Sequence, residues 1–239
     1  MKRKLVFLHG WGMHPVIWHP LLERFDSATA LPLPGYAGSA PAQTLDEMAD
    51  RLALELDAQT TLVGWSLGGL VAMRMAIRYP EKVGRLVLIG VTPCFVNRAD
   101  WRWGVEDAVF DLFATNLAED YPGTIRRFLA LQAQGSDAVK TVLLGLRKQL
   151  LALPQPDMAV LESGLSILRN SDLRHGLFQL KQPVVLIHGV GDKLAPVQAA
   201  RWLKEKIPLV ALHEIKGAAH APFLSHLDEV AGVIDAIAS

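Results

Sequence analysis

Short apolar runs rich in strand-forming residues alternate with segments of helical periodicity along most of this 239-residue chain. Several runs are apolar on both faces, which is typical of strands covered by helices on two sides. The alternation predicts an α/β fold with a mostly parallel sheet and right-handed crossovers. The strands are expected at residues 5–8, 29–33, 61–63, 86–89, 184–187 and 210–214. The helices between and after them are expected at residues 18–25, 45–56, 67–79, 198–206 and 227–238.

The alternation stops between residues 92 and 181, where only helical periodicity is found. Apolar residues share one helical face over 125–132, form a second stripe from Val139 to Leu150, and suggest a further helix at 158–169. Pro154 and Pro156 separate the stripe that ends at Leu150 from the helix expected at 158–169. We therefore expect a helical cap, residues 96–180, inserted into one discontinuous core domain formed by residues 1–95 and 181–239.

Residues 64–68 read Gly-Trp-Ser-Leu-Gly, a G-x-S-x-G motif between an expected strand and an expected helix. A tight strand-to-helix turn exposes the hydroxyl of the central serine and leaves room only for small residues two positions to either side. The start of the following helix also directs free N–H groups toward developing negative charge. The motif in this setting predicts that Ser66 is a nucleophile, and an ordinary glycine-rich turn is the alternative.

A serine hydroxyl needs a general base, and His220 is the histidine best placed to supply one. It follows the last expected strand and precedes the final helix, so it should lie at the carboxyl edge of the sheet. Asp192, just after the strand at 184–187, is the candidate carboxylate that orients His220. Acyl transfer also needs donors for an oxyanion, and the backbone N–H groups of Leu67 and Trp11 are the candidates. The Trp11 side chain either walls the acyl pocket or packs in the core.

The composition excludes several other classes. Lys plus Arg and Asp plus Glu both number 24, so the formal net charge of zero gives no indication of nucleic-acid binding. The single cysteine, Cys94, excludes an internal disulfide and fits a reducing compartment. The apolar run after the basic first residues is too short for a signal peptide, and no apolar stretch reaches membrane-spanning length. We expect a cytoplasmic monomer that binds neither nucleic acid nor membrane.

Three motifs, at residues 8–12, 64–69 and 217–220, resemble those of the α/β-hydrolase superfamily, in which the triad follows the order serine, aspartate, histidine. Within it, the chain resembles the family of pimeloyl-[acyl-carrier protein] methyl ester esterases of biotin synthesis. That narrower likeness extends to residues 127–132, 151–156 and 221–226. Ala37 departs from the pattern, because relatives usually carry glycine there.

The resemblance implies a serine carboxylesterase that hydrolyses the methyl ester of pimeloyl-[acyl-carrier protein] to the acid and methanol, without metal or cofactor. Small-molecule esters would also be substrates. The implied substrate contacts are Trp11, Ser66, Leu67, Phe128, Leu129, Ala130, Leu131, Gln132 and His220. A general short-chain carboxylesterase, a lactonase and a C–C bond hydrolase use the same triad and remain alternatives. From another class, a binding protein without turnover is the rival.

Basic residues outnumber acidic ones between residues 121 and 150, where Asp137 is the one acidic residue. On a helical projection Lys140, Arg147 and Lys148 lie away from the apolar stripe, with Leu144 and Leu151 among them. A basic face with leucines suits an acidic carrier protein, and a solvated helix face is the alternative. The residues expected to dock the carrier are Arg126, Arg127, Lys140, Arg147 and Lys148. Trp101 and Trp103, at the start of the cap, either gate the site or pack.

Overall fold

The computed structural model describes residues 4–151 and 156–238. Its six strands form one parallel sheet in the order β2-β1-β3-β4-β5-β6. The predicted α/β class is confirmed, and each expected strand overlaps an observed one. The strands are β1 (Leu5–Leu8), β2 (Ala28–Leu31), β3 (Thr60–Trp65), β4 (Val83–Ile89), β5 (Val184–Gly189) and β6 (Val210–Ile215).

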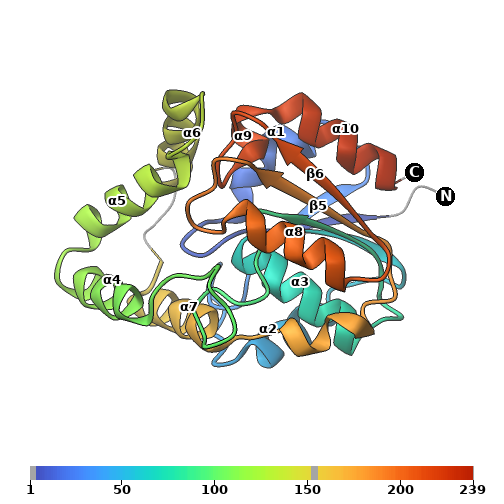
Figure 1. The fold of residues 1–239 in the computed structure, drawn as a ribbon, viewed down its shortest axis with the longest axis horizontal. Coiled ribbons are helices and arrows are strands. Elements are labelled where there is room, and N and C mark those ends of the chain that lie inside the picture. The colour runs from blue at the N-terminus through green and yellow to red at the C-terminus, as the bar shows by residue number, and fades with distance from the viewer. Residues whose placement is uncertain (1–3, 152–155, 239) are drawn as a thin grey trace.

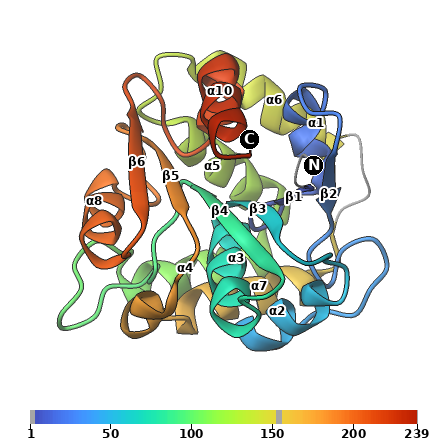
Figure 2. The same cartoon turned by 90° about the vertical axis from the view of Figure 1, so that its right-hand side faces the viewer.

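Helices cover both faces of the sheet (Figure 2). The α1 helix (His19–Leu22) and the α10 helix (Leu227–Ala238) lie on one face. The other face carries α2 (Leu45–Ala53), α3 (Leu67–Arg78) and α8 (Val197–Lys206), as right-handed crossovers require. The sequence predicted a longer first helix, 18–25. Pro20 fits only the first turn of a helix, and a 3-10 turn, η1 (Pro15–Trp18), occupies the preceding residues.

The central strands supply the core of the sheet. Every residue of β1, β3 and β5 is buried, as expected for strands that are covered by helices on both faces. Phe7, Trp18 and Trp65 are among the largest fully buried side chains. Each apolar side chain buried in this way contributes about 1.5–3 kcal/mol. The packing fixes the carboxyl ends of the strands, from which the loops of the site emerge.

In the described part of the chain, four α-helices lie between β4 and β5, and we call them the cap. Figure 1 shows them beside the edge of the core toward which the arrowheads of β5 and β6 point. They are α4 (Asp107–Glu119), α5 (Tyr121–Ala133), α6 (Val139–Leu151) and α7 (Met158–Asn170). The remaining short helices are η2 (Arg174–Gln179) and α9 (Pro222–Ser225). None of the helices in residues 4–151 and 156–238 is long and apolar enough to cross a membrane.

The apolar stripe predicted for α6 is found in part. Val142 and Leu146 are buried, but Val139, the first residue of the helix, is 38% exposed. The side chain of Leu150 and residues 152–155, which the sequence motif at 151–156 includes, lie outside the described residues. The α4 helix has no counterpart among the helices named from the sequence.

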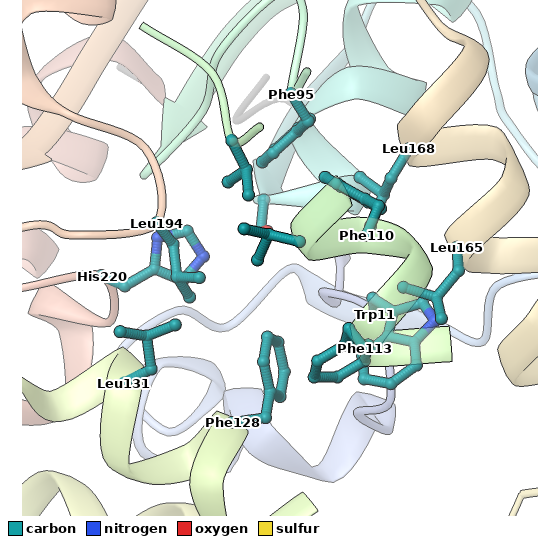
Figure 3. Close-up of a pocket in the computed structure, with 13 residues that line it drawn as sticks. Trp11, Phe95, Phe110, Phe113, Phe128, Leu131, Leu165, Leu168, Leu194 and His220 are labelled. Atoms are coloured by element: carbon teal, nitrogen blue, oxygen red, sulfur yellow. The ribbon is translucent and has the colours of Figure 1, made fainter. Parts of the chain in front are cut away.

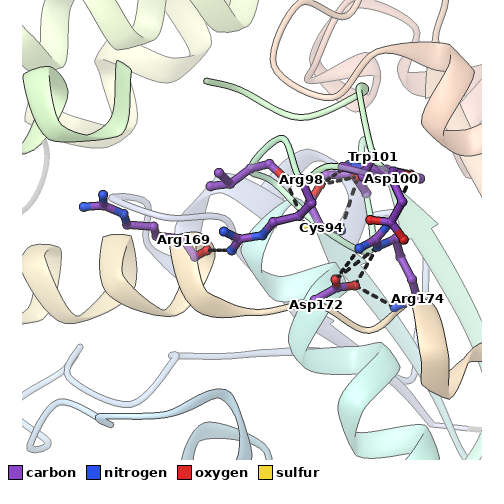
Figure 4. A network of polar contacts seen from close by, with 9 residues as sticks. Cys94, Arg98, Asp100, Trp101, Arg169, Asp172 and Arg174 are labelled. Atoms are coloured by element: carbon purple, nitrogen blue, oxygen red, sulfur yellow. Dashed lines mark hydrogen bonds and ion pairs between the residues drawn. The ribbon is translucent and has the colours of Figure 1, made fainter. Parts of the chain in front are cut away.

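The two ends of the cap meet at a polar and aromatic cluster beside α8 (Figure 4). The Arg174 guanidinium pairs with Asp100 at 2.9 Å and Asp172 at 2.7 Å and lies over the Trp101 ring. The Trp101 indole donates to the carbonyl of Cys94 at 2.8 Å. Its ring meets those of Trp103 and Trp202 edge to face, with centroids 4.9 and 5.0 Å away. Trp101 therefore packs at the base of the cap.

Candidate active site

Ser66 occupies the turn between β3 and α3, where the sequence motif placed it. Its backbone has φ 55° and ψ −118°, a conformation that few residues other than glycine adopt. The Ser66 N–H donates to the carbonyl of Ile89 at 3.0 Å, which ties the turn to β4. Such a strained turn persists only where the surroundings fix it, and it projects the side chain out of the sheet.

The glycines of the motif are required by close backbone contacts. A Cβ on Gly64 would lie 2.5 Å from the carbonyl oxygen of Gly68 and 2.6 Å from the Cα of Gly69. A Cβ on Gly68 would overlap the carbonyl oxygen of Leu8. The start of α3 is thereby pressed against the ends of β1 and β3. The N–H of Leu67, the first residue of α3, has no acceptor within the helix.

His220 and Asp192 are joined by a buried hydrogen bond. The Nδ1 atom of His220 lies 2.8 Å from Oδ2 of Asp192, and both side chains are almost wholly buried. The other oxygen of Asp192 accepts the backbone N–H groups of Leu194 at 2.8 Å and Ala195 at 3.0 Å. Burial alone would raise the pKa of Asp192, but His220 and the Ala195 N–H hold that pKa below its ordinary value. A charged carboxylate thus faces the imidazole.

His188 adds a contact that the sequence did not assign to the site. It lies at the end of β5, four residues before Asp192. Its Nε2 is 2.6 Å from the carbonyl of Ala195 and 3.5 Å from Oδ2 of Asp192. Burial lowers the pKa of His188, so the ring is neutral and holds the Asp192 loop without adding charge. An i, i+4 spacing brings side chains together on a helix, but these two residues lie on a strand and in the loop after it, so the sequence carried no signal for this contact.

Ser66 and His220 open into one apolar cavity of about 110 Å³ (Figure 3). Trp11 forms part of its wall, where its ring meets Phe113 and Phe128 edge to face at 5.4 and 5.1 Å. The Trp11 indole donates to the carbonyl of Leu161 on α7 at 2.8 Å, which fixes the ring. The remaining lining residues are Phe95, Val105, Val109, Phe110, Leu131, Leu165, Leu168 and Leu194.

The other residues expected from the sequence are distributed as follows. Phe128 and Leu131 line the cavity, whereas Ala130 is exposed. Leu67, Leu129 and Gln132 are buried and are not among the lining residues. The backbone carbonyl of Gln132 accepts the N–H of His220 at 3.3 Å. The five basic residues expected to dock a carrier, Arg126, Arg127, Lys140, Arg147 and Lys148, are all exposed.

Five of the thirteen lining residues come from α4 and α7, and the sequence analysis assigned no substrate contact to either helix. Val109, Phe110 and Phe113 are spaced i, i+1 and i+4 on α4. That spacing in the sequence indicates that the three side chains share one face of a helix. Among the described residues, no group of three or more His, Cys, Asp or Glu side chains could hold a metal ion.

Residues 4–227 match the family model described as the alpha/beta hydrolase fold, and the chain therefore belongs to the α/β-hydrolase family. Solved structures agree with this fold. An esterase from Exiguobacterium antarcticum has a TM-score of 0.87 at 21% identity and covers 99% of this chain and 91% of its own. A bromoperoxidase from Bacillus anthracis has a TM-score of 0.86 at 20% identity and covers 98% and 91%.

Two relatives identify the narrower family. A protein from Nitrosomonas europaea is 44% identical over 98% of this chain and 94% of its own length. One from Aromatoleum aromaticum is 42% identical over 97% and 96%. Both are named pimeloyl-[acyl-carrier protein] methyl ester esterase, and the chain belongs to the family of these esterases. It is a carboxylic ester hydrolase, as the sequence analysis predicted.

Proposed function

We propose that this chain hydrolyses the methyl ester of pimeloyl-[acyl-carrier protein], releasing methanol and pimeloyl-[acyl-carrier protein] for biotin synthesis, with Ser66, His220 and Asp192 as its catalytic triad. One observation carries the proposal. The strained turn opens Ser66 into the same apolar cavity as His220, which is bound to a buried carboxylate. The names of relatives up to 44% identical supply the substrate.

The arrangement supports acyl transfer in two steps. The Ser66 hydroxyl attacks the ester carbonyl while Nε2 of His220 takes its proton, because Nδ1 is committed to Asp192. The oxyanion accepts the N–H groups of Leu67 and Trp11. The tetrahedral intermediate collapses, and His220 returns the proton to the departing methanol. A water molecule, deprotonated by His220, then attacks the acyl-enzyme and releases the acid and Ser66.

The cavity suits an uncharged acyl chain. Of its described lining residues, only Trp11, Ser66 and His220 carry side-chain polar atoms, and the Trp11 indole is already bonded to Leu161. Transfer of a methylene group from water into such a site is favourable, by about 0.8 kcal/mol for each fully buried group. The lining contains no lysine or arginine to pair with the carboxylate that hydrolysis produces, and burying an unpaired charge is costly. An ester is therefore retained better than its acid product.

The cap supplies a surface for the carrier. Helix α5 lines the cavity with Phe128 and Leu131, and the same helix exposes Arg126 and Arg127 to solvent. Leu144 on α6 is 67% exposed. Lys140, Arg147 and Lys148 lie three or four residues from it on the same helix. Exposed cationic side chains around a leucine complement an acidic protein whose acyl chain must reach the cavity. A solvated helix face is the alternative.

We further infer that residues 96–180 are a cap inserted into a core of residues 1–95 and 181–239, and that the protein acts as a monomer in the cytoplasm. The free, buried thiol of Cys94 is compatible with a reducing compartment.

The decisive experiment measures methyl ester hydrolysis on the carrier protein and hydrolysis of p-nitrophenyl acetate with the same enzyme samples. Ser66→Ala should lose both activities. Reversing Arg127, Arg147 and Lys148 together to Glu should lower kcat/KM for the carrier-linked ester at least 10-fold and leave the small ester unchanged. The matched control reverses three exposed lysines outside the cap helices α4–α7 and should change neither activity: Lys181 before β5, and Lys204 and Lys206 on α8. Equal loss on both substrates would refute the docking surface.

The general short-chain carboxylesterase remains the second candidate, because a cavity of about 110 Å³ accepts small esters as well. Complementation of a biotin auxotroph that lacks this esterase separates the two. Growth with wild type and not with Ser66→Ala supports the biotin role. No growth with wild type, beside full activity on small esters, would favour the general esterase.

A further inference from the structure

The turn between α5 and α6, residues 134–138, touches both loops that carry the proposed triad partners of Ser66. Its Asp137 N–H donates to the carbonyl of Gly217 at 2.8 Å, on the loop that leads to His220. Just before the turn, the carbonyl of Gln132 accepts the N–H of His220 at 3.3 Å. The side chain of Asp137 also lies so close that a Cβ on Gly217 would be 2.5 Å from its Oδ2.

The same turn packs directly on the loop of Asp192 through two glycines. A Cβ on Gly135 would overlap the carbonyl oxygen of Gly191, and a Cβ on Gly191 would overlap that of Gly135. The two backbones are therefore in contact, with no side chain between them. Gly135 also has φ +95°, a conformation that glycine adopts without strain. Gly191 in turn donates its N–H to the carbonyl of Ala218 at 2.9 Å.

We infer that the α5–α6 turn is a positioning element for the Asp192–His220 pair. The two partners come from loops after different strands, β5 and β6, and their hydrogen bond of 2.8 Å depends on how those loops sit together. The loops meet at Gly191 and Ala218, and they are contacted there by Gly135 and Asp137 of the turn and by Gln132 at the end of α5. A misplacement of about 1 Å at a catalytic group can cost about 100-fold in rate. The inference rests on the proposed function, since it assigns a role within that triad.

This role differs from carrier docking, although the residues proposed to dock the carrier lie on α5 and α6, the two helices that the turn connects. A docking residue acts only on carrier-linked substrate, because a small ester does not need the carrier surface. A positioning residue acts on the chemical step itself, so its loss lowers kcat for both substrates and leaves KM little changed. The two roles can therefore be separated with the two substrates already named.

Gly135→Ala is the test, with Gly38→Ala as its matched control. Gly38 has φ +82°, so alanine there meets the same kind of backbone strain, but a Cβ would have nothing within 4 Å. We expect Gly135→Ala to lower kcat on p-nitrophenyl acetate about 10- to 100-fold with KM changed less than about 3-fold. The downfield proton resonance of the Asp192–His220 hydrogen bond should shift or broaden in this variant. Gly38→Ala should retain the wild-type resonance and rate.

Gly191→Ala keeps the inference testable if Gly135→Ala does not fold, because Gly191 has no positive φ to strain. It should show the same loss of kcat and the same change in the resonance. Where both single variants fold, the double variant should lose less than the product of the two single losses, because the first substitution already opens the contact. Wild-type kcat and resonance in a folded Gly135→Ala or Gly191→Ala protein, or an equal loss in Gly38→Ala, would overturn the inference. Failure of the proposed function would instead appear as wild-type esterase activity in Ser66→Ala.

Discussion

Replacing Asp192 with asparagine tests the triad most directly, because the surroundings dictate how an amide would sit. The Oδ1 atom of Asp192 accepts two backbone N–H groups, from Leu194 and Ala195. In Asp192→Asn the amide oxygen must keep that place, since an NH2 group there would face two donors. The NH2 group then takes the place of Oδ2, 2.8 Å from Nδ1 of His220.

That orientation imposes the wrong tautomer on His220. With a donor opposite it, Nδ1 must accept, so the ring proton moves to Nε2 and the imidazole can no longer take the proton of Ser66. Replacement of a triad aspartate by asparagine lowers kcat by about 10⁴-fold. At about 1.36 kcal/mol per tenfold change, this corresponds to about 5.4 kcal/mol of transition-state stabilisation.

The assay is steady-state hydrolysis of p-nitrophenyl acetate, with thermal unfolding to verify that the variant is folded. Asp57→Asn is the control, because Asp57 is an exposed residue paired with Lys4 far from the cavity, and it should retain the wild-type kcat. A kcat for Asp192→Asn within 10-fold of wild type, in a folded protein, would show that Asp192 does not orient the base.

Three further predictions concern the pocket and the stability of the fold. In Gly164→Ala the new Cβ would lie 2.7 Å from Cδ1 of Trp11 and press the ring into the cavity, so kcat/KM for p-nitrophenyl hexanoate should fall about 10-fold relative to the acetate. An unchanged ratio would refute this. Ala37→Gly removes an alanine at φ 54° and should raise the free energy of unfolding by about 0.5–1 kcal/mol, seen as a higher urea midpoint; a lower midpoint would contradict it. The hydrogen bond from Arg74 holds the pKa of Asp46 below its usual 3.8, so its stabilisation exists above that pH and disappears as the pH falls through the folded value. Asp46→Asn should cost at most about 1 kcal/mol at pH 7 and progressively less as the pH falls below 3.8, and a cost that does not diminish with falling pH would disprove the linkage.

The sheet and its connections were predictable because their signals are local. The alternation of strand and helix patterns predicted all six strands. The glycine spacing around Ser66 predicted a tight turn, and the φ of 55° at Ser66 is typical of such a turn. The bounds of β3 and β4 extend beyond the expected residues, since polar positions such as Thr60 and Arg85 pair in the sheet despite weak hydrophobic signals. Pairing with a neighbouring strand, rather than the residue itself, decides such ends.

The cap was predictable as helical but not in its detail. Most of the α4 helix is exposed; Val109, Phe110 and Phe113 line the cavity, whereas Leu117 is buried in the core. A pattern of apolar residues does not distinguish those two destinations. The substrate contacts expected at residues 128–132 divide in the same way. Consecutive residues of a helix face different directions, so Phe128 and Leu131 reach the cavity while Ala130 points to solvent.

Contacts between distant residues explain why the site is more constrained than its motifs suggest. Gly135 and Gly191 are 56 positions apart in the sequence and carry no side chains, so no motif joins them, yet their backbones touch beside Asp192. Gly164 on α7 lies directly against the Trp11 ring, where a Cβ would be 2.7 Å from Cδ1 of the indole. In both pairs a glycine on the side of the cap allows close contact with a residue of the core. The core motifs therefore bring Ser66, Asp192 and His220 to one place, and Gly135 and Gly164 set how closely the cap approaches the Asp192 loop and the Trp11 wall of the cavity.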